Sequence, residues 1–281
     1  MLRRVNHFGL PIVIGSLAAA TFFCDIAAAD TLEFKDPAGD DNGWGKAEYP
    51  TGGDYSAGAF DMVGLKIEDD GDHIVFEIEM AKKVTDPWKS REWRGNGFSL
   101  QFAQIYLDTD GKRRKGERKG LPGSWVAFTP DSYWEKVIVV SPQPASKVRG
   151  EIAGKASYLK SKIVIPARTE ARGKKLIARV AVADLGGKPT KAWGVQVLML
   201  SNEGFPARED LLSRKVNELP GEHRFGGGCD GYGDPHVIDM LAGQAKAAAD
   251  EVKAQHDALS KFRCSDEPKK AKVAKISAIR R

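Results

Sequence analysis

The stretch VGLKIEDDGDHIVFEIEM, residues 63–80, decides the fold class of this chain. In its second half every other side chain is apolar, and this apolar face carries Ile74, Phe76, Ile78 and Met80. A period of two indicates a β-strand with one buried face. The first half repeats the pattern at Val63, Leu65 and Ile67, and the Asp-Asp-Gly-Asp joint at 69–72 is a hairpin signal. The stretch therefore predicts two antiparallel strands.

Further strands are predicted beyond this hairpin, at 98–108, 134–141, 161–167, 176–184 and 193–201. Several of these runs are apolar on both faces, which is typical of strands near the middle of a β-sandwich. Because no segment of helical period interrupts residues 60–201, the sequence predicts an all-β fold, an antiparallel β-sandwich or jelly roll over residues 30–240. The polar connections at 112–123 and 141–150 are expected to be surface loops.

The last part of the chain changes character. Apolar residues recur at helical spacing between Val237 and Phe262, with Ala and Lys frequent among them. We therefore expect a C-terminal α-helical extension at 241–264. Residues 265–281 are small and basic, and this composition predicts a disordered tail.

Residues 1–29 have the features of a secretory signal. A basic start is followed by an apolar run at 8–23 and by Ala27-Ala28-Ala29, so we expect cleavage before Asp30 and export to the periplasm or the cell surface. A lipoprotein signal at Cys24 is the alternative, but the bulky Phe22-Phe23 pair precedes that cysteine. A retained anchor is disfavoured because the apolar run is shorter than the roughly 20 residues that span a bilayer.

The charge of the chain is unevenly distributed. Of the net charge of +5, residues 1–29 supply +1 and residues 268–281 supply +6, which leaves −2 for the body. A nearly neutral body is unlike a nucleic-acid-binding domain, which carries its positive charge on a folded face. We expect the basic tail to contact an anionic envelope surface, and the alternative is a solvated tail that only aids solubility.

Two cysteines remain in the chain after the expected cleavage. In an oxidising compartment Cys229 and Cys264 predict one disulfide, which would tie the C-terminal helix to the sandwich. A metal or catalytic role for two widely separated cysteines is the weaker alternative.

Acidic residues cluster in two glycine-rich loops, DPAGDDNG at 36–43 and FGGGCDGYGDPHVID at 225–239. Crowded carboxylates repel one another unless a cation lies between them, and Ca²⁺ accepts about six to eight oxygens in a flexible geometry. The sequence therefore predicts bound calcium, with the candidate ligands Asp36, Asp40, Asp41, Asp61, Asp230 and Asp234; Asp239 also lies in the second loop. The alternative is that these are ordinary turn residues. The stretch at 108–117 begins like an EF-hand, but Lys112 replaces its third acidic ligand, which excludes that motif.

Two tryptophans fall outside every apolar period and are expected to be exposed. Trp44 lies between two glycines and Trp93 lies in a polar run, so each is a candidate for stacking on a sugar ring.

The sequence carries none of the common hydrolase, metalloprotease or nucleotide-binding motifs, which indicates a protein that is not an enzyme. A pair of glycosidase carboxylates stays open, because their separation is a three-dimensional property.

Several separated motifs resemble the C-terminal module of bacterial glucodextranases. They are DPAGDDNG, YPTGGDYSAGAFDMVGLKIEDDGDHIVFEIEM, NGFSLQFAQIYLDTD and FGGGCDGYGDPHVIDML, and they cover residues 32–241 in order. The resemblance implies a β-sandwich like DOMON-like domains and family-nine carbohydrate-binding modules. It further implies a non-catalytic, calcium-stabilised module that binds polysaccharide or attaches to the cell envelope. Trp44 and the Cys229–Cys264 pair depart from the family pattern.

Two other functions remain open from the sequence. Because DOMON-like sandwiches include haem binders, a haem or electron-transfer module is one alternative, with the strand residues Met80 and Met199 as candidate axial ligands. A glycan-active enzyme with an unrecognised site is the other.

Overall fold

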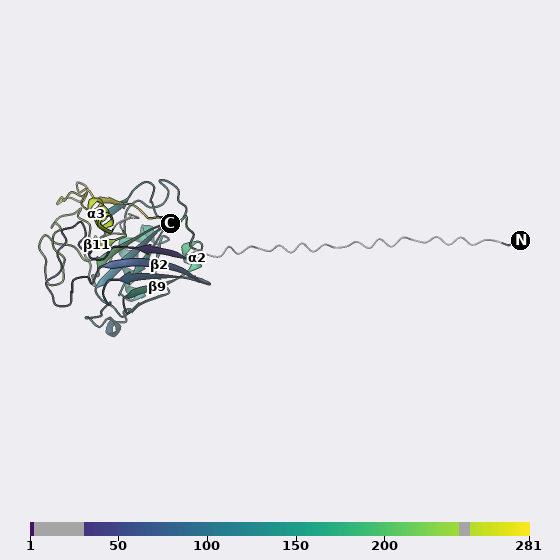
Figure 1. Ribbon diagram of the computed structural model, residues 1–281, viewed down its shortest axis with the longest axis horizontal. Coiled ribbons are helices and arrows are strands. Elements are labelled where there is room, and N and C mark those ends of the chain that lie inside the picture. The colour runs from purple at the N-terminus through teal and green to yellow at the C-terminus, as the bar shows by residue number, and fades with distance from the viewer. Residues whose placement is uncertain (3–30, 242–247) are drawn as a thin grey trace.

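The structure is a computed structural model that describes residues 1–2, 31–241 and 248–281 (Figure 1). Most of the expected signal segment, residues 1–29, lies outside the described residues. None of the helices in the described ranges is long and apolar enough to cross a membrane.

The first sheet contains the strands of the sequence-predicted hairpin. It comprises β1 (Leu32–Lys35), β2 (Met62–Asp70), β3 (His73–Met80), β8 (Arg168–Arg172) and β9 (Lys175–Ala181). The strand order is β1-β2-β3-β9-β8, with every pair antiparallel. β3 and β9 alternate between buried and partly exposed side chains, so one face of the sheet packs on the core. The labels β2 and β9 in Figure 1 mark this sheet, in which β3 lies between these two strands.

One residue of the predicted hairpin faces the other way. Val63 was expected to share a face with Leu65 and Ile67, but the register of β2 on β3 shifts between Met62 and Gly64. This bulge turns Val63 partly outward and gives the buried position to Met62, which is fully covered.

The second sheet is buried on both faces along its central strands. It comprises β4 (Gln101–Asp108), β6 (Lys136–Val140), β7 (Ile163–Val164), β10 (Gly194–Ser201) and β11 (Val237–Met240), in the order β11-β10-β4-β6-β7. Every residue of β4 and β10 is buried, as their apolar sequences predicted. The short edge strand β7 pairs parallel to β6, so this sheet is mixed. Residues of both sheets form one hydrophobic core, and the all-β sandwich is confirmed.

Segments from the end of the chain add further cover to the second sheet. Strand β12 (Ala274–Ile276) pairs in parallel with β5 (Val126–Phe128), and Gln196 on β10 donates from Nε2 to the backbone carbonyls of Leu241 and Ser277. The prediction of a disordered tail at 265–281 is therefore wrong. Ala274 and Ile276 are buried between exposed lysines, so the tail has an apolar face that its basic composition concealed.

Helices occur in segments where the sequence predicted loops or a strand. α1 (Ala145–Lys155) occupies most of the expected 141–150 loop, because Val148 and Ile152, four residues apart, bury one helical face. Short helices are η1 (Ser90–Trp93), η2 (Ser157–Leu159) and α2 (Val182–Leu185). The C-terminal helix α3 is confirmed at Ala248–Leu259 but is shorter than expected. Residues 242–247 of the expected helix lie outside the described residues, and residues 237–240, which precede the expected helix, form β11.

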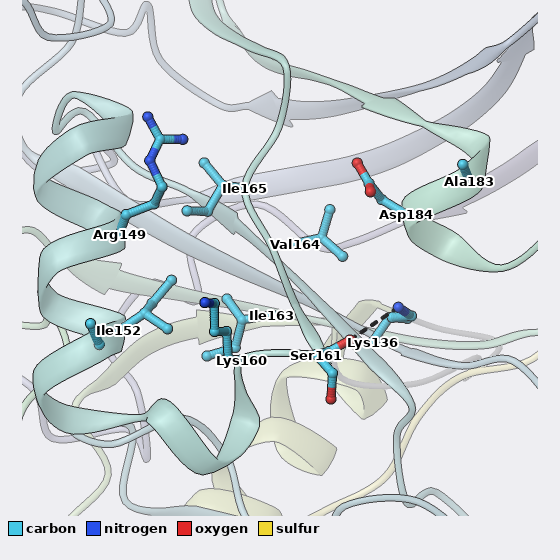
Figure 2. Close-up of a pocket in the computed structure, with 11 residues that line it drawn as sticks. Lys136, Arg149, Ile152, Lys160, Ser161, Ile163, Val164, Ile165, Ala183 and Asp184 are labelled. Atoms are coloured by element: carbon cyan, nitrogen blue, oxygen red, sulfur yellow. Dashed lines mark hydrogen bonds between the residues drawn. The ribbon is translucent and has the colours of Figure 1, made fainter.

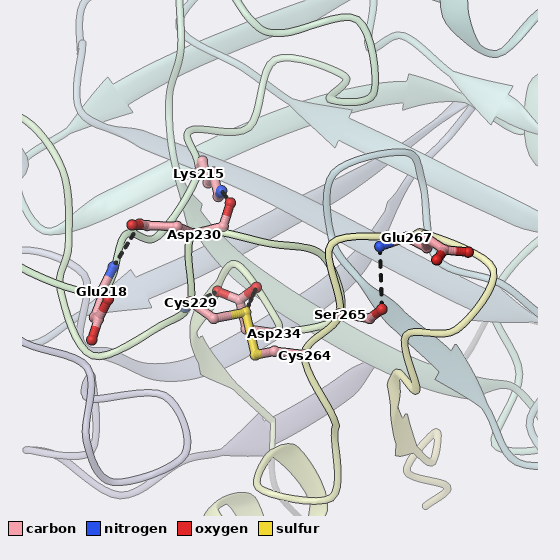
Figure 3. Close-up of a disulfide and its surroundings, with 8 residues drawn as sticks. All are labelled: Lys215, Glu218, Cys229, Asp230, Asp234, Cys264, Ser265 and Glu267. Carbon is pink, nitrogen blue, oxygen red and sulfur yellow. Dashed lines mark hydrogen bonds between the residues drawn. A yellow bond between two sulfur atoms is a disulfide. The ribbon is translucent and has the colours of Figure 1, made fainter.

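The predicted disulfide is confirmed. Cys229 and Cys264 are joined, with 6.4 Å between their Cα atoms and a sequence separation of 35. Figure 3 shows the bond linking the glycine-rich loop before β11 to the segment that follows α3.

Candidate functional site

Four buried carboxylates gather at one end of the first sheet. Asp36 directly follows β1, Asp40 lies in the next turn, Asp61 precedes β2, and Asp239 lies on β11 of the other sheet. One carboxylate oxygen each from Asp36, Asp40 and Asp239 lies within 4.8 Å of the other two. Both acidic loops of the sequence thus supply the cluster, although Asp239 was not among the predicted ligands.

Backbone amides hold two of these carboxylates in place. Gly39 N donates to Asp61 Oδ2 at 2.9 Å, and Met62 N donates to Asp239 Oδ2 at 2.7 Å. Gly39 has a φ of 91°, in the region that favours glycine, so the loop can curl toward Asp61. Both oxygens of Asp40 and the Oδ1 atoms of Asp61 and Asp239 are buried without a hydrogen-bond partner in the described part of the chain. Buried polar atoms normally have partners, so these oxygens are available to bind a ligand.

Burial and mutual repulsion disfavour the charged form of Asp40, Asp61 and Asp239. Burial, with a contribution from Asp61, raises the pKa of Asp40 to about 7. Burial also raises the pKa of Asp61 to about 6, and burial with repulsion from Asp36 and Asp40 raises that of Asp239 well above its ordinary value. Within the described ranges, no lysine or arginine forms an ion pair with Asp40, Asp61 or Asp239. The electrostatic imbalance would be relieved by a cation.

The chemistry of this donor set fits a hard cation. All four side chains offer oxygen, which suits Ca²⁺ better than zinc, whose structural sites use mostly nitrogen and sulfur. Asp41, the remaining predicted ligand of the first loop, is nearby but accepts a hydrogen bond from the Tyr49 hydroxyl. Asp36, Asp40, Asp61 and Asp239 are therefore the residues that could hold the ion.

Helix α3 is attached to the same loop. Gln255 is fully buried; its Nε2 donates to the Asp40 backbone carbonyl at 2.6 Å, and its Oε1 accepts from Met240 N at 2.9 Å. His256 Nε2 lies 2.9 Å from Asn42 Oδ1. The helix thus connects the Asp40 loop to β11, and both of these segments carry carboxylates of the cluster.

The other predicted metal ligands lie elsewhere. Asp230 is exposed, and Asp234 Oδ2 accepts a hydrogen bond from Cys229 N at 3.2 Å beside the disulfide (Figure 3). The sulfurs of Cys229 and Cys264 are bonded to each other, so they are not thiolate ligands. The structure therefore does not bring Asp230 or Asp234 to the carboxylate cluster.

A second acidic group lies in the EF-hand-like stretch. Asp108, Asp110 and Glu135 approach one another within 4.8 Å, but the Arg280 guanidinium from the C-terminal segment pairs with the buried Asp108. Arg280 Nη1 also donates to the Ala192 backbone carbonyl at 2.6 Å. An arginine of the chain itself thus supplies the positive charge at this group.

Trp44 and Trp93 have different surroundings. Trp44 was predicted to be exposed, but it is only 6% exposed and packs edge-on against Phe262 at 5.5 Å between ring centroids. The exposure prediction is wrong because the C-terminal segment, distant in sequence, covers the Gly-Trp-Gly turn. Trp93 is partly exposed, and its indole Nε1 donates to the Trp88 carbonyl at 3.1 Å.

Trp93 lines an open groove of about 570 Å³. The groove combines aromatic and polar side chains: Trp88, Trp93, Phe205, His223, Gln143, Asn202, Glu203 and Arg214. Asn202, Gln143 and Arg214 are buried at its base, and Gln143 Nε2 donates to Asn202 Oδ1 at 3.3 Å. Phe205 at its rim is 93% exposed. The sequence suggested only Trp93, because the groove residues come from three separate loops that no local pattern connects.

A larger pocket of about 660 Å³ has a different character (Figure 2). Arg149 of α1 and Asp184 of α2 face each other across Ile163, Val164 and Ile165. No aromatic side chain is among the residues that line it, so it offers no stacking surface for a sugar ring.

The candidate haem ligands are ordinary core residues. Met80 and Met199 are 1% and 0% exposed and belong to the hydrophobic core of the sandwich. Core packing is the usual role of a strand methionine.

Comparison with known proteins agrees with this architecture. No curated protein matches the chain. Residues 31–277 match the family described as the C-terminal binding-module, SLH-like, of glucodextranase. The match covers both sheets, α3 and β12, and so includes the end of the chain that the sequence motifs did not reach. The chain therefore belongs to the family of glucodextranase C-terminal, SLH-like binding modules.

Proposed function

We propose that this protein is a non-catalytic module that binds a glycan in the groove lined by Trp88 and Trp93. The observation that supports it most directly is the combination in that groove of partly exposed aromatic rings and buried hydrogen-bonding side chains. Sugar rings present apolar faces and hydroxyl edges, so a glycan site needs both kinds of group. The groove volume of about 570 Å³ lies in the range of small-molecule sites.

The polar base of the groove is held by internal contacts. Arg214 Nε donates to the Asn202 carbonyl at 3.1 Å and lies 3.2 Å from Glu203 Oε2. The same guanidinium lies over the Trp88 ring at 5.3 Å, which fixes the orientation of that ring. Side chains that are already ordered lose less entropy when a ligand binds, so this base suits direct recognition of hydroxyl groups.

The test is binding to a panel of α- and β-glucans and envelope polysaccharides, measured by affinity electrophoresis and calorimetry. Trp93→Ala should weaken binding at least tenfold while leaving the thermal midpoint nearly unchanged. Tyr158→Ala is the matched control, because Tyr158 is 71% exposed and lies outside the groove. Equal affinity of both variants and the wild type would refute the groove as the binding site, and turnover of any glycan would refute the non-catalytic assignment.

We infer in addition that Asp36, Asp40, Asp61 and Asp239 hold a calcium ion. The support is the unpartnered buried oxygens of Asp40, Asp61 and Asp239 together with the raised pKa values of these three groups. The ion would join the Asp40 loop, the start of β2 and β11, and so stabilise the fold rather than take part in chemistry.

We also propose that the module acts outside the cytoplasm at the cell envelope. Membership of a binding-module family supports an association with a glycan or an envelope surface. Lys269, Lys270, Lys272 and Lys275 of the C-terminal segment are exposed and could add electrostatic contact with an anionic surface. Replacing these four lysines with glutamine should reduce co-sedimentation with anionic vesicles at low salt, whereas unchanged co-sedimentation would exclude this contact.

A further inference from the structure

A second pocket, of about 270 Å³, lies beside the disulfide and shares no lining residue with the Trp88–Trp93 groove. Its walls are formed by Trp125, Ala207, Glu209, Asp210, Lys215, Asp230, Gly231, Tyr232, His236 and Asp266. The Cys229–Cys264 bond and the backbone pairing of Tyr232 with Ser265 fix two of these walls to each other (Figure 3). The pocket is therefore held in shape by covalent and backbone contacts.

The charge of this pocket is strongly negative. Glu209, Asp210, Asp230 and Asp266 line it, against the single cation Lys215. The Lys215 ammonium donates to the backbone carbonyl of Asp230, which accepts the hydrogen bond without bringing a negative charge of its own. Four carboxylates against one ammonium favour a positively charged ligand.

Two aromatic rings form one side of the pocket. Trp125 and Tyr232 lie 5.4 Å apart between ring centroids, tilted by 46°. Trp125 has a φ of 52°, a left-handed conformation that is rare for a large side chain and costs free energy. The Trp125 side chain lies close to the Asp210 carboxylate and opposes the rise in the pKa of Asp210, to about 6, that burial causes. The strained backbone of Trp125 thus lies beside an acidic group of the pocket.

A buried histidine supplies an unused polar atom. His236 lines the pocket and is only 2% exposed, and its Nδ1 has no hydrogen-bond partner among the residues that the structure describes. Nδ1 lies 4.0 Å from Asp210 Oδ1, too far for a direct hydrogen bond. Burial lowers the pKa of His236 to about 3, so the ring is neutral and Nδ1 can donate or accept according to its tautomer. A ligand hydroxyl group placed between His236 Nδ1 and Asp210 Oδ1 would give Nδ1 a hydrogen-bond partner.

From these features we propose that the pocket binds a hexosamine with a free amino group. Its ammonium would lie among the carboxylates of Asp210, Asp230 and Asp266. The apolar face of the sugar ring would pack on Trp125 and Tyr232, and one hydroxyl would bond to His236.

The lining favours an organic cation over a bare metal ion. The groups of three acidic, histidine or cysteine residues found close enough to share an ion, within the described ranges, do not include these carboxylates. Asp230 and Asp266 are exposed, whereas a metal needs its oxygen ligands to converge closely. Aromatic rings also add nothing to calcium coordination but do attract an ammonium ion.

The experiment titrates the full mature chain with glucosamine, N-acetylglucosamine and glucose, followed by tryptophan fluorescence and by NMR. Glucosamine should bind at least tenfold more tightly than the other two sugars, because acetylation removes the charge. Asp266→Asn should weaken glucosamine binding severalfold, and Tyr232→Ala at least tenfold. Asp266 is exposed, so its variant keeps the fold and tests the charge directly.

The control variant Trp93→Ala separates this pocket from the groove. It should keep glucosamine binding even where it loses the glycan bound by the groove, so the two proposals can fail independently. A chitosan hexamer that binds with the same dependence on Tyr232 would show a polymer as the source of the amino sugar, and binding of the monomer alone would show the free sugar. Equal affinity for glucosamine and N-acetylglucosamine would overturn the proposal, as would a pocket that responds to CaCl₂ or ZnCl₂ but not to glucosamine.

Discussion

The calcium proposal makes a prediction that depends on pH. The pKa of Asp40 is raised from 3.8 to about 7 by burial and by Asp61, so without calcium the folded state holds a proton that the unfolded state has released. Stability falls with rising pH wherever the folded state binds more protons. The stability that the protonated Asp40 contributes begins to fall above about pH 4 and is fully lost above about pH 7. Calcium reverses it, because the ionised carboxylates become ligands. The stabilisation by calcium should therefore increase with pH.

The raised pKa sets the size of this effect. A pKa difference of about three pH units corresponds to about 4 kcal/mol, of which about 3 kcal/mol develops between pH 5 and pH 8. For a domain of this size each kcal/mol shifts the thermal midpoint by about 2–4 °C, so the expected change is about 6–12 °C. The pKa values of Asp61 and Asp239 are also raised, so both groups add to the loss of stability with rising pH.

The assay compares thermal scans in excess calcium and in excess chelator at each pH. The difference between the two scans is the quantity to follow, because other groups also titrate. Burial lowers the pKa of His236 to about 3, so His236 alone makes the fold less stable as the pH falls below about 6.5. That contribution is the same with and without calcium and cancels in the difference.

Asp40→Asn should abolish the calcium-dependent difference at every pH. Asp184→Asn is the matched control, since Asp184 is exposed on α2 and should leave the difference unchanged. Superimposable scans at pH 8 would refute the calcium site. A difference that stays constant from pH 5 to pH 8 would refute the titration argument while leaving calcium binding intact.

Three further predictions concern the C-terminal part of the chain. Replacing Cys229 and Cys264 with serine should lower the free energy of unfolding by about 4 kcal/mol, the chain-entropy value for a 35-residue loop, as measured by urea titration; an unchanged midpoint would contradict it. Truncation after Glu267 removes the buried Ile276 and should cost at least about 2 kcal/mol, whereas a disordered tail would cost nothing. Trp44→Ala should cost about 3–5 kcal/mol, because the ring is buried against Phe262, while glycan binding stays intact; a loss of binding with the midpoint unchanged would instead place Trp44 in a ligand site.

Local sequence patterns predicted the strands whose buried and exposed faces can be identified from residues close to one another in sequence. The hairpin of β2 and β3 followed from alternation and an Asp-Gly turn, and β4 and β10 followed from runs that are apolar on both faces. Local patterns did not predict the ordered structure of the tail, because β12 pairs with residues 126–128, almost 150 positions earlier. Its burial depends on a partner that composition cannot reveal.

The candidate site was predictable to a similar degree. Asp36, Asp40 and Asp61 were found from their crowding near one glycine-rich loop, which is a local signal. Asp239 lies within the apolar strand β11, where a single carboxylate is unexpected, and that contrast was the available clue to its role. Its proximity to Asp36 is set by the packing of two sheets, so sequence spacing could not supply it.

The attachment of Gln255 to the Asp40 loop has a consequence for how the protein reaches its final form. During synthesis the segment that carries Asp40 emerges 215 residues before Gln255, so the contact that joins the Asp40 loop to α3 cannot form until most of the chain has been made. Pairings of such long sequence separation carry a large loop-closure entropy and form slowly. An ion that binds the finished cluster would therefore be captured in a late step of folding, and nascent chains should remain insensitive to calcium until α3 has docked.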